Sequence, residues 1–336
     1  MKLAYLCYWD LAAGDGVARK IEGQAALWRE AGHEVDVVAV RPGHRREETS
    51  AAVAAVDADL LYLRYDLFLP PVWRLVRRVP TVVEVNSDDR AEMRLRGYGA
   101  RAFNRVNRRR VLGAARGTVA VTAELARRQS GPIAVIANGA DADAVPTLDA
   151  PANERPRAVF AGSPMMAWHG VDRLVELAAA VPEVDFDLVG PRPGDVPPNV
   201  TVHGTLAGEA YWAVLARADV AVGSLAMERA GLREGSPLKV REYLLAGIPT
   251  VIGYDDTDFP GEPPWYLTRL AGPDAFRRFV ADTRGRRTPR AELEPRLSWR
   301  AKEAARLAFF DRVLGIRYGS HHGDYSSTEP HSEPHG

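Results

Sequence analysis

Two glutamates separated by seven residues, Glu234 and Glu242, enclose a segment that predicts the start of a helix. Ser236 has a side chain suited to the N-cap, and Pro237 suits the first helical position, where the backbone N–H is unpaired in any case. Backbone N–H groups at such a helix start point outward and stabilise a phosphate. The carboxylate of Glu242 lies about one turn further along and is placed to accept hydrogen bonds from sugar hydroxyls. The segment therefore indicates a site for a sugar nucleotide.

The residues that follow predict that this helix leads into a buried strand. Gly247 ends an apolar pattern of helical spacing, and residues 248–252 are typical of a strand. A surface helix that carries two solvated acids is the alternative interpretation. Gly235 after the first acid, the Ser-Pro pair and Pro249 favour the binding site over that alternative.

This acid–helix–strand pattern resembles the donor-binding motif of retaining family 4 glycosyltransferases, which have the GT-B fold. The resemblance implies that Glu242 binds the nucleotide ribose and that Glu234 contacts the donor sugar. It implies that the pyrophosphate is held by the backbone of Gly235, Ser236, Pro237 and Leu238. The implied fold is α/β, with two doubly wound Rossmann-like domains facing across a cleft and a C-terminal helix that crosses back.

The composition is that of a globular protein with room for two domains. The chain has 336 residues, of which 46% are hydrophobic and 26% charged, and its formal net charge is zero. A neutral chain has no overall field that attracts nucleic acid, and we expect no nucleic-acid partner. No apolar run approaches the roughly 20 residues of a membrane helix, and no signal peptide is expected, because the chain opens on a strand pattern. We therefore expect a cytoplasmic protein.

Strand patterns alternate with helical patterns in two series, which predicts two parallel sheets. The predicted strands lie at residues 3–7, 34–40, 60–64, 81–86, 118–122 and 133–138, and then at 158–161, 186–190, 200–203, 220–223 and 250–253. We expect an N-terminal acceptor-side domain over 1–145, a linker over 146–157, a C-terminal nucleotide-sugar-binding domain over 158–297, a crossover helix over 298–317 and a disordered tail over 318–336.

A glycine-rich turn follows the first predicted strand at Gly14 and Gly16. The third glycine of a dinucleotide fingerprint is absent, and the second strand is not followed by an acid for a ribose, so an NAD site is not favoured. The resemblance places Gly14 and Gly16 on the acceptor side of the cleft. A simple tight turn explains them equally well.

The first strand of the second series ends at Gly162 and Ser163, six residues before His169. Many family members have an arginine and a lysine at the positions of Ser163 and His169, where both neutralise the pyrophosphate. His169 can donate hydrogen bonds instead, and Lys239, in the first turn of the donor helix, can supply the missing charge. The resemblance thus implies Glu234, Lys239 and His169 as catalytic residues and Gly162 and Ser163 as donor-binding residues. A capping or surface histidine is the alternative for His169.

Three further residues have weaker signals. His203 ends a predicted strand that resembles the one against which the nucleotide base stacks, although a polar strand end explains it as well. Glu84 and Asn86 end a buried strand and resemble an acceptor-side segment of related glycosyltransferases, so we expect both to point into the cleft.

Residues 94–128 contain ten arginines and one acid, Glu124. Such a basic segment can meet an anionic membrane or a phosphate-bearing lipid acceptor, which would make the protein peripheral at the inner face of the membrane. A solvated helix face is the alternative explanation.

The expected function is transfer of a sugar, with retention, from a nucleotide diphosphate-sugar to a hydroxyl of a glycan, a lipid-linked acceptor or a natural product. A UDP-sugar is the favoured donor, and no metal or cofactor is expected. Two alternatives remain open at this point. One is a sugar-nucleotide epimerase on the same scaffold. The other is a catalytically inactive partner subunit, which Ser163 and His169 keep open.

Overall fold

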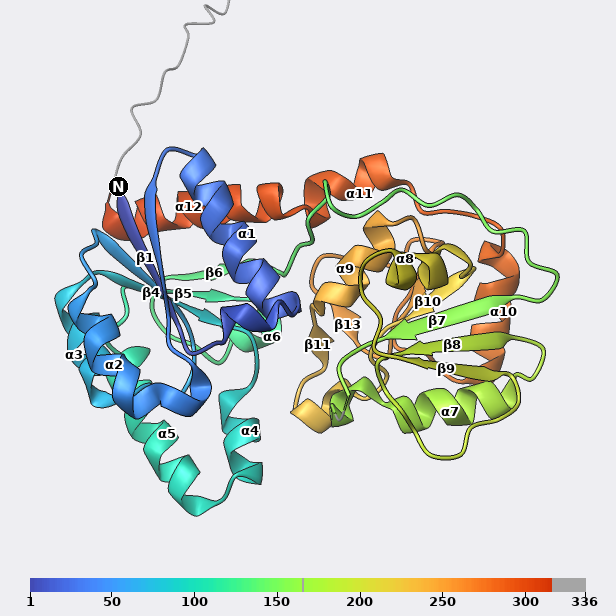
Figure 1. The fold of residues 1–336 in the computed structure, drawn as a ribbon, viewed down its shortest axis with the longest axis horizontal. Coiled ribbons are helices and arrows are strands. Elements are labelled where there is room, and N and C mark those ends of the chain that lie inside the picture. The colour runs from blue at the N-terminus through green and yellow to red at the C-terminus, as the bar shows by residue number, and fades with distance from the viewer. Residues whose placement is uncertain (165, 316–336) are drawn as a thin grey trace, which may run out of the picture.

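Two parallel six-stranded sheets organise the chain, as Figure 1 shows for a computed structural model that describes residues 1–164 and 166–315. The first sheet has the order β2-β1-β3-β4-β5-β6 and the second the order β14-β12-β10-β7-β8-β9. The first comprises β1 (Lys2–Cys7), β2 (Glu34–Ala39), β3 (Leu60–Arg64), β4 (Thr81–Val85), β5 (Gly117–Ala120) and β6 (Ile133–Val135). The second comprises β7 (Arg157–Ala161), β8 (Asp185–Val189), β9 (Val200–Gly204), β10 (Val220–Val222), β12 (Thr250–Val251) and β14 (Tyr266–Leu267).

Helices connect the strands, because parallel neighbours cannot be joined by a tight turn. The first sheet carries α1 (Gly16–Glu30), α2 (Arg45–Ala54), α3 (Pro70–Arg78), α4 (Asp89–Leu95), α5 (Tyr98–Val111) and α6 (Ala123–Ala126). The second carries α7 (Val171–Ala180), α8 (Gly208–Ala216), α9 (Leu238–Leu245), α10 (Pro273–Thr283) and α11 (Arg290–Leu297). We refer to these two assemblies as the N-terminal and C-terminal domains.

The apolar strand patterns are explained by burial on both faces. Every residue of β4 and β5 is buried, as is usual for parallel strands covered by helices on each side. Each of the eleven predicted strands is present, so the prediction of a two-part, doubly wound α/β architecture is confirmed. The sequence did not predict the small sheet formed by β11 (Glu234–Gly235) and β13 (Asp255–Asp256).

The last helix, α12 (Trp299–Leu314), lies against the N-terminal domain (Figure 1), as the crossover prediction required. Ser298 caps it by accepting a hydrogen bond from the Ala301 N–H at 3.3 Å. The Trp299 ring packs on α1 so closely that a Cβ at Gly23 would lie 2.3 Å from it. From α12, Glu303 accepts a 2.8 Å hydrogen bond from the Trp28 indole. The chain therefore completes the first core with its last helix.

The predicted linker falls in the connection between β6 and β7. The predicted tail lies outside the described residues. In the described part of the chain, no helix combines the length and the apolar character needed to cross a membrane.

Candidate active site

The segment between the two glutamates folds differently from the prediction at its first turn. Pro237 is the N-cap of α9 and Leu238 the first helical residue, so Ser236 is not the N-cap. The Ser236 hydroxyl is engaged elsewhere, because it accepts hydrogen bonds from the Asn138 N–H at 2.8 Å and from the Arg241 guanidinium at 2.9 Å. Ser236 therefore ties the N-terminal domain to the start of α9.

Arg241 holds this turn in place and was missed in the sequence. Its guanidinium is fully buried and donates to the Asp256 carboxylate at 2.5 and 2.8 Å and to the Asn138 carbonyl at 3.1 Å. The only sequence signal is its position among the apolar residues of α9, where a charged side chain requires a buried partner. Asp256 also pairs with Gly235 in the β11–β13 sheet, so the same residue contacts both the loop and α9.

Three residues from separate parts of the C-terminal domain meet at this helix start. A Cβ at Gly162, directly after β7, would lie 2.7 Å from the His169 ring and 3.1 Å from the Lys239 Nζ. Lys239 Nζ also lies 3.7 Å from the centre of the Phe160 ring. Gly162, His169 and Lys239, which the sequence predicted in one site, are therefore adjacent.

The Lys239 ammonium and one ring nitrogen of His169 lack a hydrogen-bond partner in the described residues. Lys239 Nζ and His169 Nδ1 are both buried and neither makes a hydrogen bond there. Burial holds the pKa of Lys239 well below its usual range. Burial and, secondly, the neighbouring Lys239 lower the pKa of His169 to about 3, so its ring is neutral at physiological pH. A bound anion would supply the missing partner and favour the charged form of Lys239.

A second glycine brings the ends of β7 and β8 together. Gly190 has a φ of +98°, and a Cβ there would lie 1.9 Å from the Gly162 carbonyl oxygen. Only glycine fits this position, and the sequence analysis did not single it out. Ser163, which follows Gly162, is exposed.

Glu242 faces the N-terminal domain from the second turn of α9. Its carboxylate lies 3.7 Å from the Arg19 guanidinium of α1 and accepts a 3.4 Å hydrogen bond from the Tyr211 hydroxyl of α8. Burial raises the pKa of Glu242 from its ordinary value. Neither partner was predicted, because both come from distant elements.

The predicted glycine-rich turn lies on the opposite side of this site. A Cβ at Gly16 would lie 3.5 Å from the Leu238 side chain, so the start of α1 contacts the start of α9. Gly14 ends a short 3₁₀ helix with a φ of +59° and has open space around it. The structure therefore places Gly16 next to the predicted donor residues.

Glu234 and Glu124 form a reciprocal contact between the domains. The Glu234 carboxylate accepts hydrogen bonds from the Glu124 N–H at 2.7 Å, at the start of α6, and from the Arg127 guanidinium at 2.8 Å. In return, the Glu124 carboxylate accepts from the N–H groups of Arg233 and Glu234 at 2.7 and 3.0 Å. Glu234, the residue predicted to contact the donor sugar, is thus hydrogen-bonded to the N-terminal domain.

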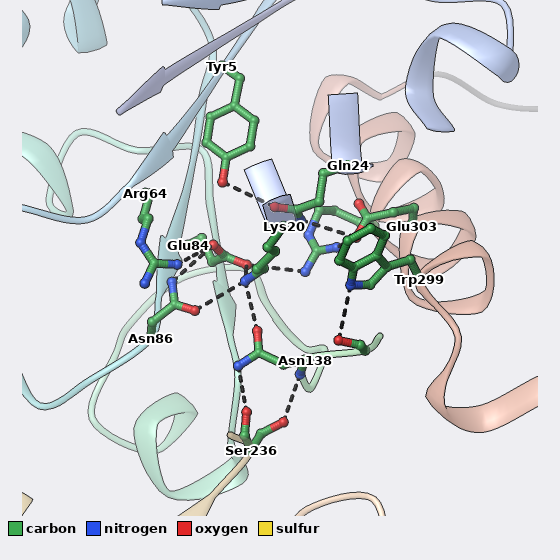
Figure 2. Close-up of polar contacts among 12 residues, drawn as sticks. Tyr5, Lys20, Gln24, Arg64, Glu84, Asn86, Asn138, Ser236, Trp299 and Glu303 are labelled. Carbon is green, nitrogen blue, oxygen red and sulfur yellow. Dashed lines mark hydrogen bonds and ion pairs between the residues drawn. The ribbon is translucent and has the colours of Figure 1, made fainter. Parts of the chain in front are cut away.

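The structure places Glu84 away from the cleft that the sequence predicted for it. Glu84 has no exposed surface, and its carboxylate faces the cationic groups of Lys20 and Arg64 (Figure 2). The Arg306 guanidinium of α12 lies 3.3 Å from the same carboxylate. These charges favour the ionised carboxylate and lower its pKa, whereas burial lowers the pKa of Lys20 to about 8. Glu84 therefore stabilises the end of β4 and does not face an acceptor.

Asn86 belongs to the same network. Its amide donates to Glu84 at 3.0 Å, and its carbonyl oxygen accepts from Lys20 at 3.2 Å. Lys20 also donates to the Asn138 side chain at 2.8 Å, and the Asn138 amide in turn donates to the Ser236 carbonyl (Figure 2). The network connects the first sheet to the start of α9.

His203 pairs with an acid in the second sheet. Its Nε2 lies 2.6 Å from Asp187, which also accepts a hydrogen bond from Arg157 at 2.9 Å. The contact engages one ring nitrogen of His203. Stacking of the nucleotide base against His203 stays a prediction. Within residues 1–164 and 166–315, no group of three or more His, Cys, Asp or Glu side chains is arranged to hold a metal ion.

Solved structures of glycosyltransferases are similar to this chain over almost its whole length. Sucrose-phosphate synthase of Thermosynechococcus elongatus is 16% identical, with a TM-score of 0.73 and a match that covers 94% of this chain and 100% of that one. HepE of Anabaena in complex with UDP-glucose is 16% identical, with a TM-score of 0.65 and coverages of 92% and 99%. AviGT4, a glycosyltransferase involved in avilamycin A biosynthesis, is 13% identical, with a TM-score of 0.57 and coverages of 94% and 98%. The chain has the GT-B fold.

No protein-family profile and no curated protein sequence matches this GT-B chain. In its GT-B arrangement, the C-terminal domain supplies Gly162, Lys239 and Glu242, and the N-terminal domain supplies Arg19 opposite Glu242. The candidate site is therefore shared by both domains.

Proposed function

We propose that this GT-B protein transfers a sugar from a UDP-sugar to a hydroxyl acceptor with retention, without a catalytic metal. The observation that carries the proposal is the pair of buried nitrogens beside Gly162, Lys239 Nζ and His169 Nδ1, which make no hydrogen bond within the residues that the structure describes. An anionic diphosphate at the start of α9 would give both a partner, and the helix N-terminus would add to its stabilisation. HepE, which has the same fold, has been solved with UDP and with UDP-glucose, which supports a uridine donor.

The proposed reaction places charge where these residues can stabilise it. The acceptor oxygen bonds to the anomeric carbon on the face that the diphosphate leaves, the bond from that carbon to the diphosphate breaks, and the acceptor proton passes to a leaving phosphate oxygen. Lys239 and the start of α9 each stabilise the developing negative charge by about 1–2 kcal/mol. His169, neutral in the free protein, acts as a hydrogen-bond donor to the diphosphate.

The two glutamates have separate proposed roles. Glu242, beside Arg19 and Tyr211, accepts hydrogen bonds from the ribose hydroxyls. Glu234 contacts the donor sugar, for which it must exchange at least part of its contact with Glu124 and Arg127. Donor binding is then coupled to the contact between the domains.

Thermal unfolding with UDP, GDP, dTDP and ADP at about 1 mM tests the proposal. A ligand at about 100 times its Kd stabilises the folded state by about 2.7 kcal/mol, which raises the Tm by several degrees. We expect UDP to stabilise the wild type and Glu176→Ala, a control at an exposed acid of α7, but not Glu242→Ala. Stabilisation by none of the four nucleotides, or equal stabilisation of Glu242→Ala, would overturn the proposed site.

A further inference from the structure

Part of the basic segment at residues 94–128 lines a groove on the N-terminal domain. Helices α4 and α5 form a hairpin that projects from the N-terminal domain (Figure 1). Between them lies a cavity of about 480 Å³, and its lining includes six arginines: Arg90, Arg94, Arg101, Arg105, Arg108 and Arg109. Arg90 and Arg94 are one turn apart on α4, and Arg101, Arg105 and Arg108 recur at helical spacing on α5. The guanidinium groups of both helices therefore converge on one space.

Most of this charge is not compensated. Arg108 pairs with Asp89, but the other five arginines have no ion pair with any acid of the described residues. These five arginines are exposed, so solvent screens their repulsion, and their guanidinium groups are free to bind a multivalent anion.

The floor of the groove is ordered by buried polar contacts. Asn104, almost fully buried, donates to Asp89 at 2.6 Å and accepts from the Tyr65 hydroxyl at 2.9 Å. Asp89 thus fixes both Arg108 and Asn104. This arrangement holds the arginine-bearing helices at a fixed separation, so the groove does not depend on the exposed side chains for its shape.

The groove lies close to the proposed donor site. A Cβ at Gly231 would lie 2.9 Å from the Ala91 Cβ, so α4 packs against the loop that leads to Glu234. Arg94 follows Ala91 by three residues, which is about 4.5 Å of helix rise. An acceptor that reaches Glu234 with one end can therefore place its other end between α4 and α5.

We propose that this groove binds a phosphate or diphosphate group carried by the acceptor. That the phosphate belongs to the acceptor rests on the proposed function. Binding of a phosphate group in the groove does not depend on it. Guanidinium groups bind phosphate oxygens through paired N–H donors, and several of them around one cavity suit a group with more than one negative charge. A concave groove between two helices suits a discrete group better than the flat surface of a bilayer.

Calorimetric titration of the full chain with sodium pyrophosphate tests the groove. The wild type is expected to bind at two sites, one at Lys239 and one in the groove. Lys239→Met removes the first, and in that background Arg94→Gln/Arg105→Gln weakens the remaining binding at least about tenfold, as the loss of charge-assisted contacts implies. Arg77→Gln/Arg78→Gln, at exposed arginines of α3, serves as the matched control and should bind like its parent.

The outcomes separate the two proposals. If pyrophosphate binding in the Lys239→Met background is unchanged by Arg94→Gln/Arg105→Gln, the groove is not the anion site. If Lys239→Met removes no binding while the groove variant does, the proposed donor site fails and the groove stands. Phosphatidylserine vesicles form a further arm. Binding to vesicles without any groove-dependent binding of pyrophosphate would overturn the proposal in favour of a membrane surface.

Discussion

Replacing Lys239 by methionine should stabilise the free protein and weaken its affinity for UDP. The Lys239 Nζ is buried beside Phe160 without a hydrogen-bond partner in the described residues. An unsatisfied buried polar group costs about 1–3 kcal/mol, and methionine keeps the volume and the contact with the aromatic ring. At about 2–4 °C per kcal/mol, the Tm of the free protein should rise by roughly 2–12 °C.

The same substitution removes the charge that UDP is proposed to meet. A charge-assisted hydrogen bond contributes about 1.5–3 kcal/mol, so the affinity for UDP should fall roughly 10- to 100-fold. Because the pKa of Lys239 is lowered in the free protein and a bound diphosphate favours the charged form, UDP binding to the wild type should take up protons at pH values above that lowered pKa, and the affinity should fall there as pH rises. Methionine should abolish that uptake.

Differential scanning calorimetry and titration calorimetry in buffers of different ionisation enthalpy measure both effects. Lys302→Met is the matched control, because the Lys302 Nζ is paired with Asp258 at 2.6 Å. That variant should destabilise the protein, since it removes one of the two cations, Lys302 and Arg241, that face the Asp258 carboxylate. A Lys239→Met protein that melts below the wild type and binds UDP equally well would refute the reasoning.

Three further variants probe the frame of the site. Gly190→Ala should lower the free energy of unfolding by more than about 3 kcal/mol in urea, because its Cβ would overlap the Gly162 carbonyl. Arg241→Met should cost about 3–5 kcal/mol by leaving a buried aspartate unpaired, and it should also weaken UDP binding. Lys20→Met should change the pH dependence of unfolding. The lowered pKa of Lys20, about 8 in the folded state, makes the unfolded chain bind more protons from there up to about 10.5, so stability should rise with pH in the wild type and less in the variant.

Each of these has a control. Gly194→Ala, at a glycine with open space and no left-handed backbone, should change stability by less than about 1 kcal/mol. Equal effects at Gly190 and Gly194 would contradict the close approach of β7 and β8. Arg290 donates to backbone carbonyls and to Glu294 at the surface, so Arg290→Met should cost less than Arg241→Met. A parallel pH profile for Lys20→Met and wild type would contradict the shifted titration of Lys20.

The fold was largely predictable because its signals are local. Buried parallel strands are recognised as short apolar runs in the sequence. Helices such as α12 begin after a capping residue, here Ser298, which is also recognisable. Short elements were missed for the same reason. The two residues of β11 pair with β13, in which Asp256 binds the distant Arg241 of α9, and no local pattern encodes that contact.

The site was predictable where the chain itself sets the spacing. Lys239 follows from the helix start, and Gly162 from the strand end, and the structure brings the two together with His169. The contacts of side chains with several possible partners were harder to predict from the sequence. Ser236 has the residue type of an N-cap, but its hydroxyl accepts hydrogen bonds from Asn138 and Arg241 and does not cap α9.

Contacts between residues far apart in the chain could not be predicted from the sequence. Glu84 ends a strand in the manner of a cleft residue, yet Lys20, Arg64 and Arg306 surround it, and the last of these comes from the far end of the chain. Arg19 and Tyr211 beside Glu242 were missed because neither lies near it in the sequence.

The position of α12 also sets the order in which this protein can finish folding during synthesis. The aromatic cluster of Trp28, Tyr62 and Phe310 in the first domain is incomplete until the final helix emerges from the ribosome. At roughly 5–20 residues per second, the stretch from the end of β6 to the end of α12 takes on the order of 10–35 s to translate. Throughout that interval the face of α1 around Trp28 is uncovered, while the second sheet is made and folds. The first domain to be translated is thus the last to be completed, and the nascent chain presents an apolar surface of the kind that chaperones bind.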